Sequence, residues 1–342
     1  MASHQSWMHL ALREARRGVG RTSPNPAVGA VIVSRGGRLL AKGWHRGAGQ
    51  PHAEIEALGR LSRPGLARGA SLYVTLEPCS THGRTPPCVD AIMAAGFARV
   101  IVAATDPNPM HAGRGLDLLS AAGIEVISGV LGAEAAALNR PFNKWVVTGL
   151  PFVIAKCALS LDGRITRLPS EGQWLSSERS RAHSHRLRGQ VDAILIGAGT
   201  LRADNPRLTV RGIPRARQPW RVVLAKAGEL PAGAHLFTDE HRERTLVYKK
   251  HSLGWVLRAL GKRGVTSVLI EGGARILGEA FDQRLVDRVQ FYVAPLLLGG
   301  PKLCIEGEGV ASLIANPEYR RIGSDLLLTG DVVYQGKRTK RT

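Results

Sequence analysis

Apolar and polar positions alternate along the first half of the chain as they do in proteins built from strands and helices in turn. Apolar side chains recurring every three to four residues predict helices, and continuous apolar runs predict buried strands. The predicted helices cover residues 7–18, 52–61, 88–95 and 115–122. The predicted strands cover residues 28–33, 38–44, 71–76, 99–105 and 124–127. This alternation is typical of a layered α/β fold with a sheet rich in parallel strands.

Residues 132–150 are interpreted as a connection between two halves. A short Ala-rich helical pattern runs from Gly132 to Asn139, and Asn139-Arg-Pro-Phe142 is interpreted as a break. Pro151 then opens a new apolar run. We therefore expect two domains, residues 1–147 and residues 148–342.

The second half alternates in the same way. The predicted strands cover 152–159, 191–196, 206–210, 220–224, 245–248, 267–271, 289–294 and 325–333. Helices are predicted over 252–261 and 274–281. Both halves are therefore expected to be α/β domains.

Length and composition support the division into two domains and indicate the cellular compartment. A chain of 342 residues with 44% hydrophobic residues fits two domains with ordinary cores. Four cysteines are too few for a disulfide framework, which favours a reducing, cytoplasmic setting. The N-terminus lacks the charged and apolar regions of a signal peptide, and no apolar run is long enough to predict a membrane span.

The net charge of +20 raises the question of a nucleic-acid partner. The excess is spread over both halves, and the one basic run is Lys337-Arg-Thr-Lys-Arg341. RNA-binding surfaces usually combine such charge with stacking aromatics, which are only 5% of this chain. We interpret the charge as a basic surface suited to small phosphorylated substrates. A homo-oligomer is expected.

The chemistry centres on Pro51-His52-Ala53-Glu54 and on two later cysteines, Cys79 and Cys88, each preceded by Pro. A His-x-Glu at a helix start followed by Pro-Cys and a second Cys indicates a zinc-dependent deaminase. One imidazole and two thiolates would hold one Zn²⁺ and leave a fourth position for water, which the metal would activate. Glu54 would not bind zinc but would carry the proton.

The two cysteines depart from the common Cys-x-x-Cys spacing of deaminases. The eight residues between them, Ser80 to Pro87, are too polar and too rich in Pro and Gly for a helix. We expect a loop facing the site. Four further polar residues lie in loops at the ends of predicted elements near this motif. Ligands bind at such positions in α/β sheets, although each of these residues could instead only stabilise the turn in which it lies. They are Asn25, His82, Asp106 and Asn108.

Two turns of small residues follow predicted strands of the second half, Gly197-Ala-Gly199-Thr200 and Gly272-Gly273. Such a turn leading into a helix can cradle phosphate, but it is often mere geometry, and neither matches the G-x-G-x-x-G fingerprint. A nucleotide cofactor and a plain structural turn therefore both stay open. Lys156, Asp204 and Glu271 lie at or near predicted strand ends, and the pattern does not decide between binding and surface placement.

Nearly the whole chain resembles the bifunctional deaminase–reductase family of bacterial riboflavin biosynthesis. In the first half the likeness rests on His52-Ala-Glu54, on Thr22 to Gly29, and on the unusual Glu77-Pro-Cys-Ser-Thr-His-Gly-Arg-Thr-Pro-Pro-Cys88. In the second half it rests on Lys156 to Ile165, Gly172-Gln-Trp174, Ala203 to Arg211 and Glu271-Gly-Gly273.

The resemblance implies a cytidine-deaminase-like three-layer α/β/α domain followed by a dihydrofolate-reductase-like α/β domain. The first would deaminate 2,5-diamino-6-ribosylamino-4(3H)-pyrimidinone 5′-phosphate with zinc. The second would use NADPH to reduce the ribosyl group, in its open imine form, to ribityl.

The resemblance also implies roles for residues. His52, Cys79 and Cys88 would bind zinc, and Glu54 would be the proton carrier. The implied deaminase substrate contacts are Asn25, His82, Asp106 and Asn108. The implied cofactor contacts are Ala158, Trp174, Thr200, Asp204 and Gly273. The implied reductase substrate contacts are Lys156, Arg188, Leu208, Arg211 and Glu271.

One position departs from the family. Where the family often carries an Asp-Ser-type turn near the cofactor, this chain has Ala225-Lys226. Lys226 is a hypothetical partner of the 2′-phosphate of NADPH through charge attraction.

Three other interpretations compete. A tRNA deaminase with a basic RNA-binding second domain would explain the charge, but it predicts Cys-x-x-Cys and stacking aromatics. A structural zinc protein would need a fourth ligand, for which His82 is the one candidate between the cysteines. An enzyme with one decayed domain would not retain motifs in both halves.

Overall fold

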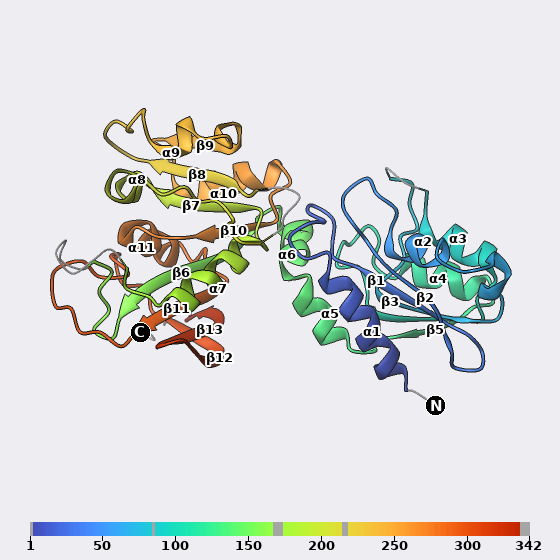
Figure 1. Ribbon diagram of the computed structural model, residues 1–342. Helices are drawn as coiled ribbons and strands as arrows, with labels where there is room; N and C mark the ends of the chain where they lie inside the picture. The colour runs from blue at the N-terminus through green and yellow to red at the C-terminus, as the bar shows by residue number, and fades with distance from the viewer. Residues whose placement is uncertain (1–2, 84–85, 167–173, 214–217, 336–342) are drawn as a thin grey trace, which may run out of the picture. The chain divides into compact units, whose positions relative to one another are not determined.

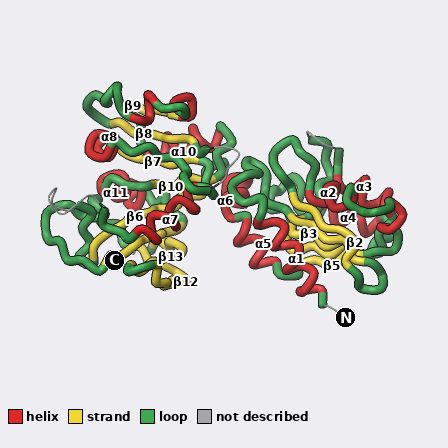
Figure 2. Tube along the Cα trace, viewed as in Figure 1, coloured by secondary structure: helices red, strands yellow, loops and turns green. Residues whose placement is uncertain are grey.

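The computed structural model describes residues 3–83, 86–166, 174–213 and 218–335. Parts of three features singled out in the sequence lie outside these ranges: residues 84–85 of the cysteine loop, Gly172-Gln173, and the basic run 337–341. The chain forms two compact units, Met1–Gly149 and Leu150–Thr342. Figures 1 and 2 show an α/β arrangement in each unit. No helix in the described ranges is both long and apolar enough to cross a membrane.

The first unit is a three-layer α/β/α sandwich around a five-stranded sheet of order β2-β1-β3-β4-β5. Strands β1 and β2 are antiparallel, as are β1 and β3, whereas β3, β4 and β5 are parallel. The strands are β1 Gly29–Val33, β2 Leu39–Trp44, β3 Ser71–Leu76, β4 Arg99–Ala104 and β5 Glu125–Ser128. The helices are α1 His4–Arg16, α2 Ala53–Leu58, η1 Pro64–Ala67, α3 Cys88–Ala95, α4 Arg114–Ala121, α5 Gly132–Leu138 and α6 Arg140–Thr148.

Alternating side chains of these strands pack on opposite faces of the sheet. On one face Ile32, Leu72 and Val102 pack with α2, α3 and α4. On the other face Val31, Tyr73 and Ile101 pack with α1 and α5. The three-layer architecture expected for this half is therefore confirmed.

The second unit contains an eight-stranded mixed sheet of order β12-β13-β11-β6-β10-β7-β8-β9. The strands are β6 Phe152–Ser160, β7 Ala193–Gly197, β8 Trp220–Ala225, β9 Thr245–Lys249, β10 Ser267–Ile270, β11 Arg288–Ala294, β12 Ser312–Ile322 and β13 Asp325–Tyr334. The helices are α7 Glu178–Arg188, α8 Ala198–Asp204, α9 His235–Thr238, η3 Arg242–Arg244, α10 Leu253–Lys262 and α11 Ala274–Asp282. From β11 through β9 neighbouring strands are parallel, and β12, β13 and β11 pair antiparallel.

Helices cover both faces of the central strands. Helices α10 and α11 pack on one face through Leu257 and Leu277, and α7, α8 and α9 pack on the other through Leu187, Leu201 and Leu236. Because the central strands are parallel, their carboxyl ends meet at one edge of the sheet. Lys156 lies on β6, Glu271 directly follows β10, and Thr200 lies at the start of α8, which directly follows β7, so these residues gather near that edge.

The structure corrects several sequence expectations. The connection predicted after Asn139 is the helix α6, and Pro141 lies in its first turn, where a missing N–H costs no hydrogen bond. The small-residue turn at 197–200 is the start of α8. The strand predicted over 206–210 does not form, and side chains rather than a neighbouring strand hold that backbone. Helix α7 and strand β12 had not been predicted.

Candidate active sites

The first site gathers His52, Cys79 and Cys88 from three separate elements. His52 caps the N-terminus of α2, Cys79 follows the end of β3, and Cys88 begins α3. The Nδ1 atom of His52 lies 3.4 Å from the Sγ atom of Cys79 and 3.3 Å from that of Cys88. The backbone N–H of Cys88 donates to Sγ of Cys79 over 3.3 Å. One imidazole nitrogen thus faces two sulfurs.

This donor set fits zinc. The three ligand atoms all lie within 4.8 Å of one another, and one imidazole with two thiolates is a usual set for a zinc ion that keeps an open position. A hydrogen bond from Cys88, with help from His52, lowers the pKa of the Cys79 thiol to about 4. In the described part of the chain, no other group of three His, Cys, Asp or Glu residues is placed to hold a metal. His82 is exposed and is not a member of the group.

Glu54 lies in the first turn of α2, two residues beyond His52, and only 3% of it is exposed. Burial raises the pKa of its carboxyl group. The carboxylate is therefore placed beside the metal ligands in a site that largely excludes water.

Asn25, Asp106 and Asn108 are half-buried in loops of the same unit. Asp106 accepts a hydrogen bond from the backbone N–H of Asn108 over 2.9 Å, so one of its carboxylate oxygens stabilises the turn after β4. Burial raises the pKa of Asp106. The amide Nδ2 of Asn25 lies 3.1 Å from Nε2 of His45.

Sequence reasoning assigned no role to His45 or Glu77. His45 is 2% exposed, its ring meets that of His52 edge-on, and its Nδ1 donates to the carbonyl oxygen of Pro51 over 3.0 Å. Glu77 is also buried and accepts three backbone N–H groups from residues 106–115. Glu77 could have been noticed as an acidic residue ending an otherwise apolar strand, whereas no pattern singles out His45.

The second site is organised around Glu271, whose side chain is 5% exposed. Arg188 of α7 donates through Nε and Nη2 to its two carboxylate oxygens over 2.6 and 2.7 Å. Lys156 of β6 lies 4.0 Å from the same carboxylate and 5.9 Å from the centre of the Tyr292 ring. Burial acts to raise the pKa of Glu271, but the charges of Arg188 and Lys156 outweigh it and hold the pKa at about 2.

Arg211 and Leu208 lie in the segment after α8. The backbone N–H of Arg211 is 3.3 Å from Nδ1 of His185, and its guanidinium is 3.3 Å from Nε2 of the same ring. Burial together with the charges of Arg188 and Arg211 lowers the pKa of His185 to about 4, so the ring is neutral at neutral pH. Arg188, Arg211 and a neutral histidine form a group suited to an anionic ligand. Leu208 is buried.

Thr200 and Gly273 come together as the cofactor interpretation requires. A Cβ atom on Gly273 would lie 3.2 Å from Oγ1 of Thr200, and Gly272 and Gly273 have φ angles of 125° and 80°, which disfavour any side chain. The turn leads into the nine-residue helix α11, whose first N–H groups can bind phosphate. This cradle fits a dinucleotide such as NADPH.

The other expected cofactor contacts are more scattered. Ala158 is half-buried on β6 beside Tyr292. Asp204 ends α8 and is exposed, although surrounding atoms still raise its pKa by partial desolvation. Trp174 is 56% exposed, with the guanidinium of Arg181 5.0 Å from its ring centre. Lys226 directly follows β8 and pairs with Glu279 over 2.8 Å.

Comparison with known proteins agrees with this division. Residues 1–104 match the cytidine and deoxycytidylate deaminase zinc-binding region, and residues 151–328 match the RibD C-terminal domain. The riboflavin biosynthesis protein RibD of Mycobacterium tuberculosis is 42% identical over 94% of this chain and 95% of its own length. That of Bacillus amyloliquefaciens is 38% identical over 97% and 99%.

Solved structures give the same result. Acinetobacter baumannii RibD superposes with a TM-score of 0.88 at 34% identity, covering 96% of this chain and 99% of its own. The diaminohydroxyphosphoribosylaminopyrimidine deaminase/5-amino-6-(5-phosphoribosylamino)uracil reductase of Thermotoga maritima superposes with a TM-score of 0.87 at 33% identity, covering 97% and 99%.

Proposed function

The chain belongs to the RibD family of bifunctional riboflavin-biosynthesis enzymes, and we propose how its residues divide the two reactions between them. It is a deaminase in its first unit and a reductase in its second, and its cofactors are Zn²⁺ and NADPH. The comparisons do not favour a tRNA deaminase.

For the deaminase, we propose that His52, Cys79 and Cys88 hold the zinc ion, which would activate a water molecule as nucleophile. Glu54 would accept a proton from that water and pass it to the ring nitrogen, and it would then transfer a second proton, from the hydroxyl group added to the ring carbon, to the departing ammonia. The proposal is supported by the convergence of the three ligand atoms within 4.8 Å and by the burial of Glu54 beside them. Asn25, Asp106, Asn108 and the exposed His82 bind the pyrimidine ribotide.

For the reductase, Thr200 and the turn at Gly273 would hold the phosphates of NADPH, and Asp204, Ala158 and Trp174 would contact the rest of the cofactor. When bound, NADPH would supply the hydride that reduces the ribosyl carbon of the open imine form. Arg188 and Arg211 bind the anionic substrate, with Leu208 packing against it. The carboxylate of Glu271 stays ionised and fixes Arg188, and it lies beside Lys156. Lys156 lies near the reacting centre.

The substrate of the first step is proposed to be 2,5-diamino-6-ribosylamino-4(3H)-pyrimidinone 5′-phosphate. The guanidinium groups of Arg188 and Arg211 in the second unit suit a phosphate ester, and the net charge of +20 attracts anionic substrates. Purified protein should release ammonia from this compound and then oxidise NADPH, which is followed at 340 nm. A zinc chelator should abolish ammonia release. Ammonia release without NADPH oxidation would support only the deaminase activity. The absence of both ammonia release and NADPH oxidation would overturn the proposal.

We also propose a cytoplasmic, homo-oligomeric enzyme. The four cysteines are free thiols, as expected in a reducing compartment. The edge strand β12 and its neighbour β13 carry exposed apolar side chains suited to an interface with another copy, namely Leu313, Tyr319, Leu326 and Val333. The molar mass, measured by light scattering during size-exclusion chromatography, tests this assembly. A monomeric mass at micromolar concentration would contradict it.

A further inference from the structure

The segment 205–211 carries two proposed reductase contacts, Leu208 and Arg211, but belongs to no helix or strand. Its backbone takes positive φ angles at Asn205, 40°, and at Leu208, 50°. Asn visits this region readily, whereas for Leu it costs free energy and persists only where the surroundings impose it. The conformation of this segment is therefore held from outside.

Side chains from neighbouring elements replace the missing strand partner. Gln218 binds both backbone groups of Val210, accepting its N–H over 2.7 Å and donating to its carbonyl over 3.2 Å. Arg188 donates to the carbonyl oxygen of Thr209 over 3.1 Å, and Arg221 donates to that of Arg207 over 3.3 Å. These contacts fix the backbone at residues 207, 209 and 210 of the segment.

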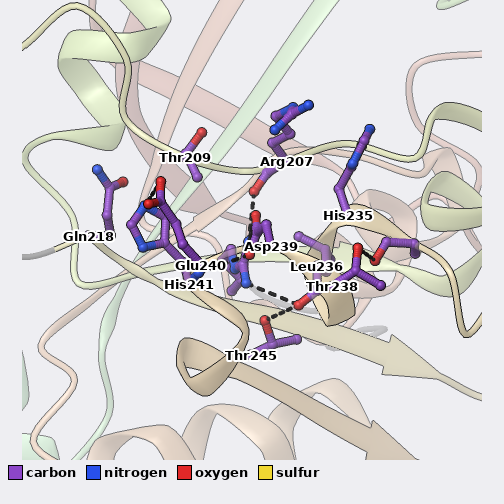
Figure 3. A network of polar contacts seen from close by, with 12 residues as sticks. Arg207, Thr209, Gln218, His235, Leu236, Thr238, Asp239, Glu240, His241 and Thr245 are labelled. Atoms are coloured by element: carbon purple, nitrogen blue, oxygen red, sulfur yellow. Dashed lines mark hydrogen bonds and ion pairs between the residues drawn. The ribbon is translucent and has the colours of Figure 1, made fainter.

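Arg221 is unusual among them because it lies inside the sheet. It is a residue of β8 with 1% of its surface exposed. Its Nη1 pairs with Asp239 over 2.6 Å, and its Nη2 donates to the carbonyl oxygen of Leu236 over 3.0 Å. Figure 3 shows these partners, Arg207, Leu236 and Asp239, gathered in one network. The guanidinium therefore ties the segment to α9 and to the turn that follows it.

A buried ion pair is weak support for stability, because desolvation offsets much of the attraction. Within the described residues, Nε of Arg221 also has no hydrogen-bond partner, which adds to the cost of burial. An apolar side chain of similar size would avoid both costs. We therefore look for the role of Arg221 in the backbone segment that it orients rather than in the stability of the fold.

We propose that Arg221 is a positioning residue of the reductase. It fixes the backbone of residues 205–211 and thereby places Leu208 and Arg211 where the ribotide binds. The proposal rests on the roles proposed above for these two residues.

The test compares Arg221→Met, which removes the charge and every hydrogen bond, with Arg221→Lys, which keeps the charge but cannot form all three contacts. The Met variant should raise KM for the ribotide in reduction by about 10- to 100-fold, since small misplacements of binding groups have effects of this order. Its kcat, its KM for NADPH and its deaminase activity should change little. The KM of the Lys variant for the ribotide should lie between the values of the Met variant and the wild type.

Amide hydrogen exchange gives a readout independent of activity. Without substrate, the backbone N–H groups of residues 207–211 should exchange faster in Arg221→Met, while the sheet keeps its protection. Unchanged exchange and an unchanged KM would overturn the proposal. If Arg221→Met does not fold, Asp239→Asn, which removes the charge on the other side of the ion pair, is measured in the same way. Faster exchange with a raised KM would support the proposal, and no change in either would overturn it.

Arg288→Met is the matched control. Arg288 of β11 forms an ion pair of similar length with Asp331, over 2.7 Å, in the same sheet, with 25% of the Arg288 side chain exposed. Its loss should lower stability without raising KM, and an equal rise in KM would show that general loosening explains the effect. If Arg211→Ala leaves KM unchanged, the assigned role of Arg211 fails, and the exchange measurement still tests whether Arg221 holds the segment.

Discussion

Glu54 is the single residue on which the proposed deaminase chemistry depends most directly. It is buried beside three metal ligands but does not belong to their group. Its carboxylate is the group that can both accept and return a proton, which an amide of the same shape cannot do.

Glu54→Gln should therefore lower kcat for ammonia release by about 10²- to 10⁴-fold, the usual contribution of a positioned acid–base group. Zinc content, measured by atomic absorption, should stay at one ion per chain. Reduction of the deaminated ribotide by the same protein is the internal control and should be unaffected. Ammonia release at the wild-type rate would remove Glu54 from proton transfer.

Lys226 is the hypothetical partner of the 2′-phosphate of NADPH. It is half-exposed and bound to Glu279 over 2.8 Å, so a 2′-phosphate would have to compete with that carboxylate. Lys226→Ala should raise KM for NADPH a few-fold and leave KM for NADH unchanged, since exposed charge pairs contribute only about 0–1 kcal/mol. Lys262→Ala, which removes the same charge at the end of α10, should change neither constant. Equal effects on both cofactors would refute the hypothesis.

At the scale of elements, the loop between β4 and α4 depends on one buried side chain. Glu77 accepts the N–H groups of Asp106, Gly113 and Gly115 over 3.1, 2.9 and 2.8 Å. A Cβ atom on Gly115 would collide with the carbonyl oxygen of Pro78, so the start of α4 approaches the segment after β3 closely. Glu77 thereby connects the strand that leads to Cys79 with the loop that carries Asp106 and Asn108.

Glu77→Gln should destabilise the first unit by about 1–3 kcal/mol, because an amide N–H₂ would face buried N–H donors. It should also raise KM for deamination, since the loop loses its anchor. Urea unfolding and steady-state kinetics measure the two effects. Glu125→Gln makes the same chemical change at an exposed surface pair, 61% exposed, and should cost less than about 0.5 kcal/mol. Similar losses in the two variants would contradict the anchoring role of Glu77.

At the scale of the whole molecule, each set of proposed site residues lies within one compact unit. The metal ligands and Glu54 belong to Met1–Gly149, and the Glu271 cluster belongs to Leu150–Thr342. The two activities should therefore be separable by substitution.

Asp204→Asn should lower kcat/KM for reduction by about 10- to 100-fold, the size of a lost hydrogen bond to a charged group, and should leave ammonia release unchanged. Cys88→Ser is the reciprocal variant, and it should lose zinc and deamination while still reducing the deaminated ribotide. Ammonia release and NADPH oxidation are measured separately for each protein. A parallel loss of both activities in either variant would contradict the division into two sites.

The sequence by itself determined what depends on short stretches of chain. Regular apolar spacing predicted most strands and helices, because burying one face of an element imposes a period that is visible in the sequence. The pattern of His52, Cys79 and Cys88 predicted a zinc site from residues that the structure brings together, since strand and helix ends are local features and metal ligands are chemically distinctive. Family resemblance supplied the proposed reductase contacts, whereas the pattern alone left the roles of Lys156 and Glu271 undecided.

Only the tertiary structure decided which distant side chains meet. Arg188 and Glu271 are 83 positions apart and form one ion pair, and no periodicity predicts such a pairing. The sequence predicts a strand over residues 206–210, but these residues lack a neighbouring strand and take their conformation from Gln218, Arg188 and Arg221. Hydrogen bonds between side chains and a distant backbone depend on how the elements pack, and packing is a property of the whole fold.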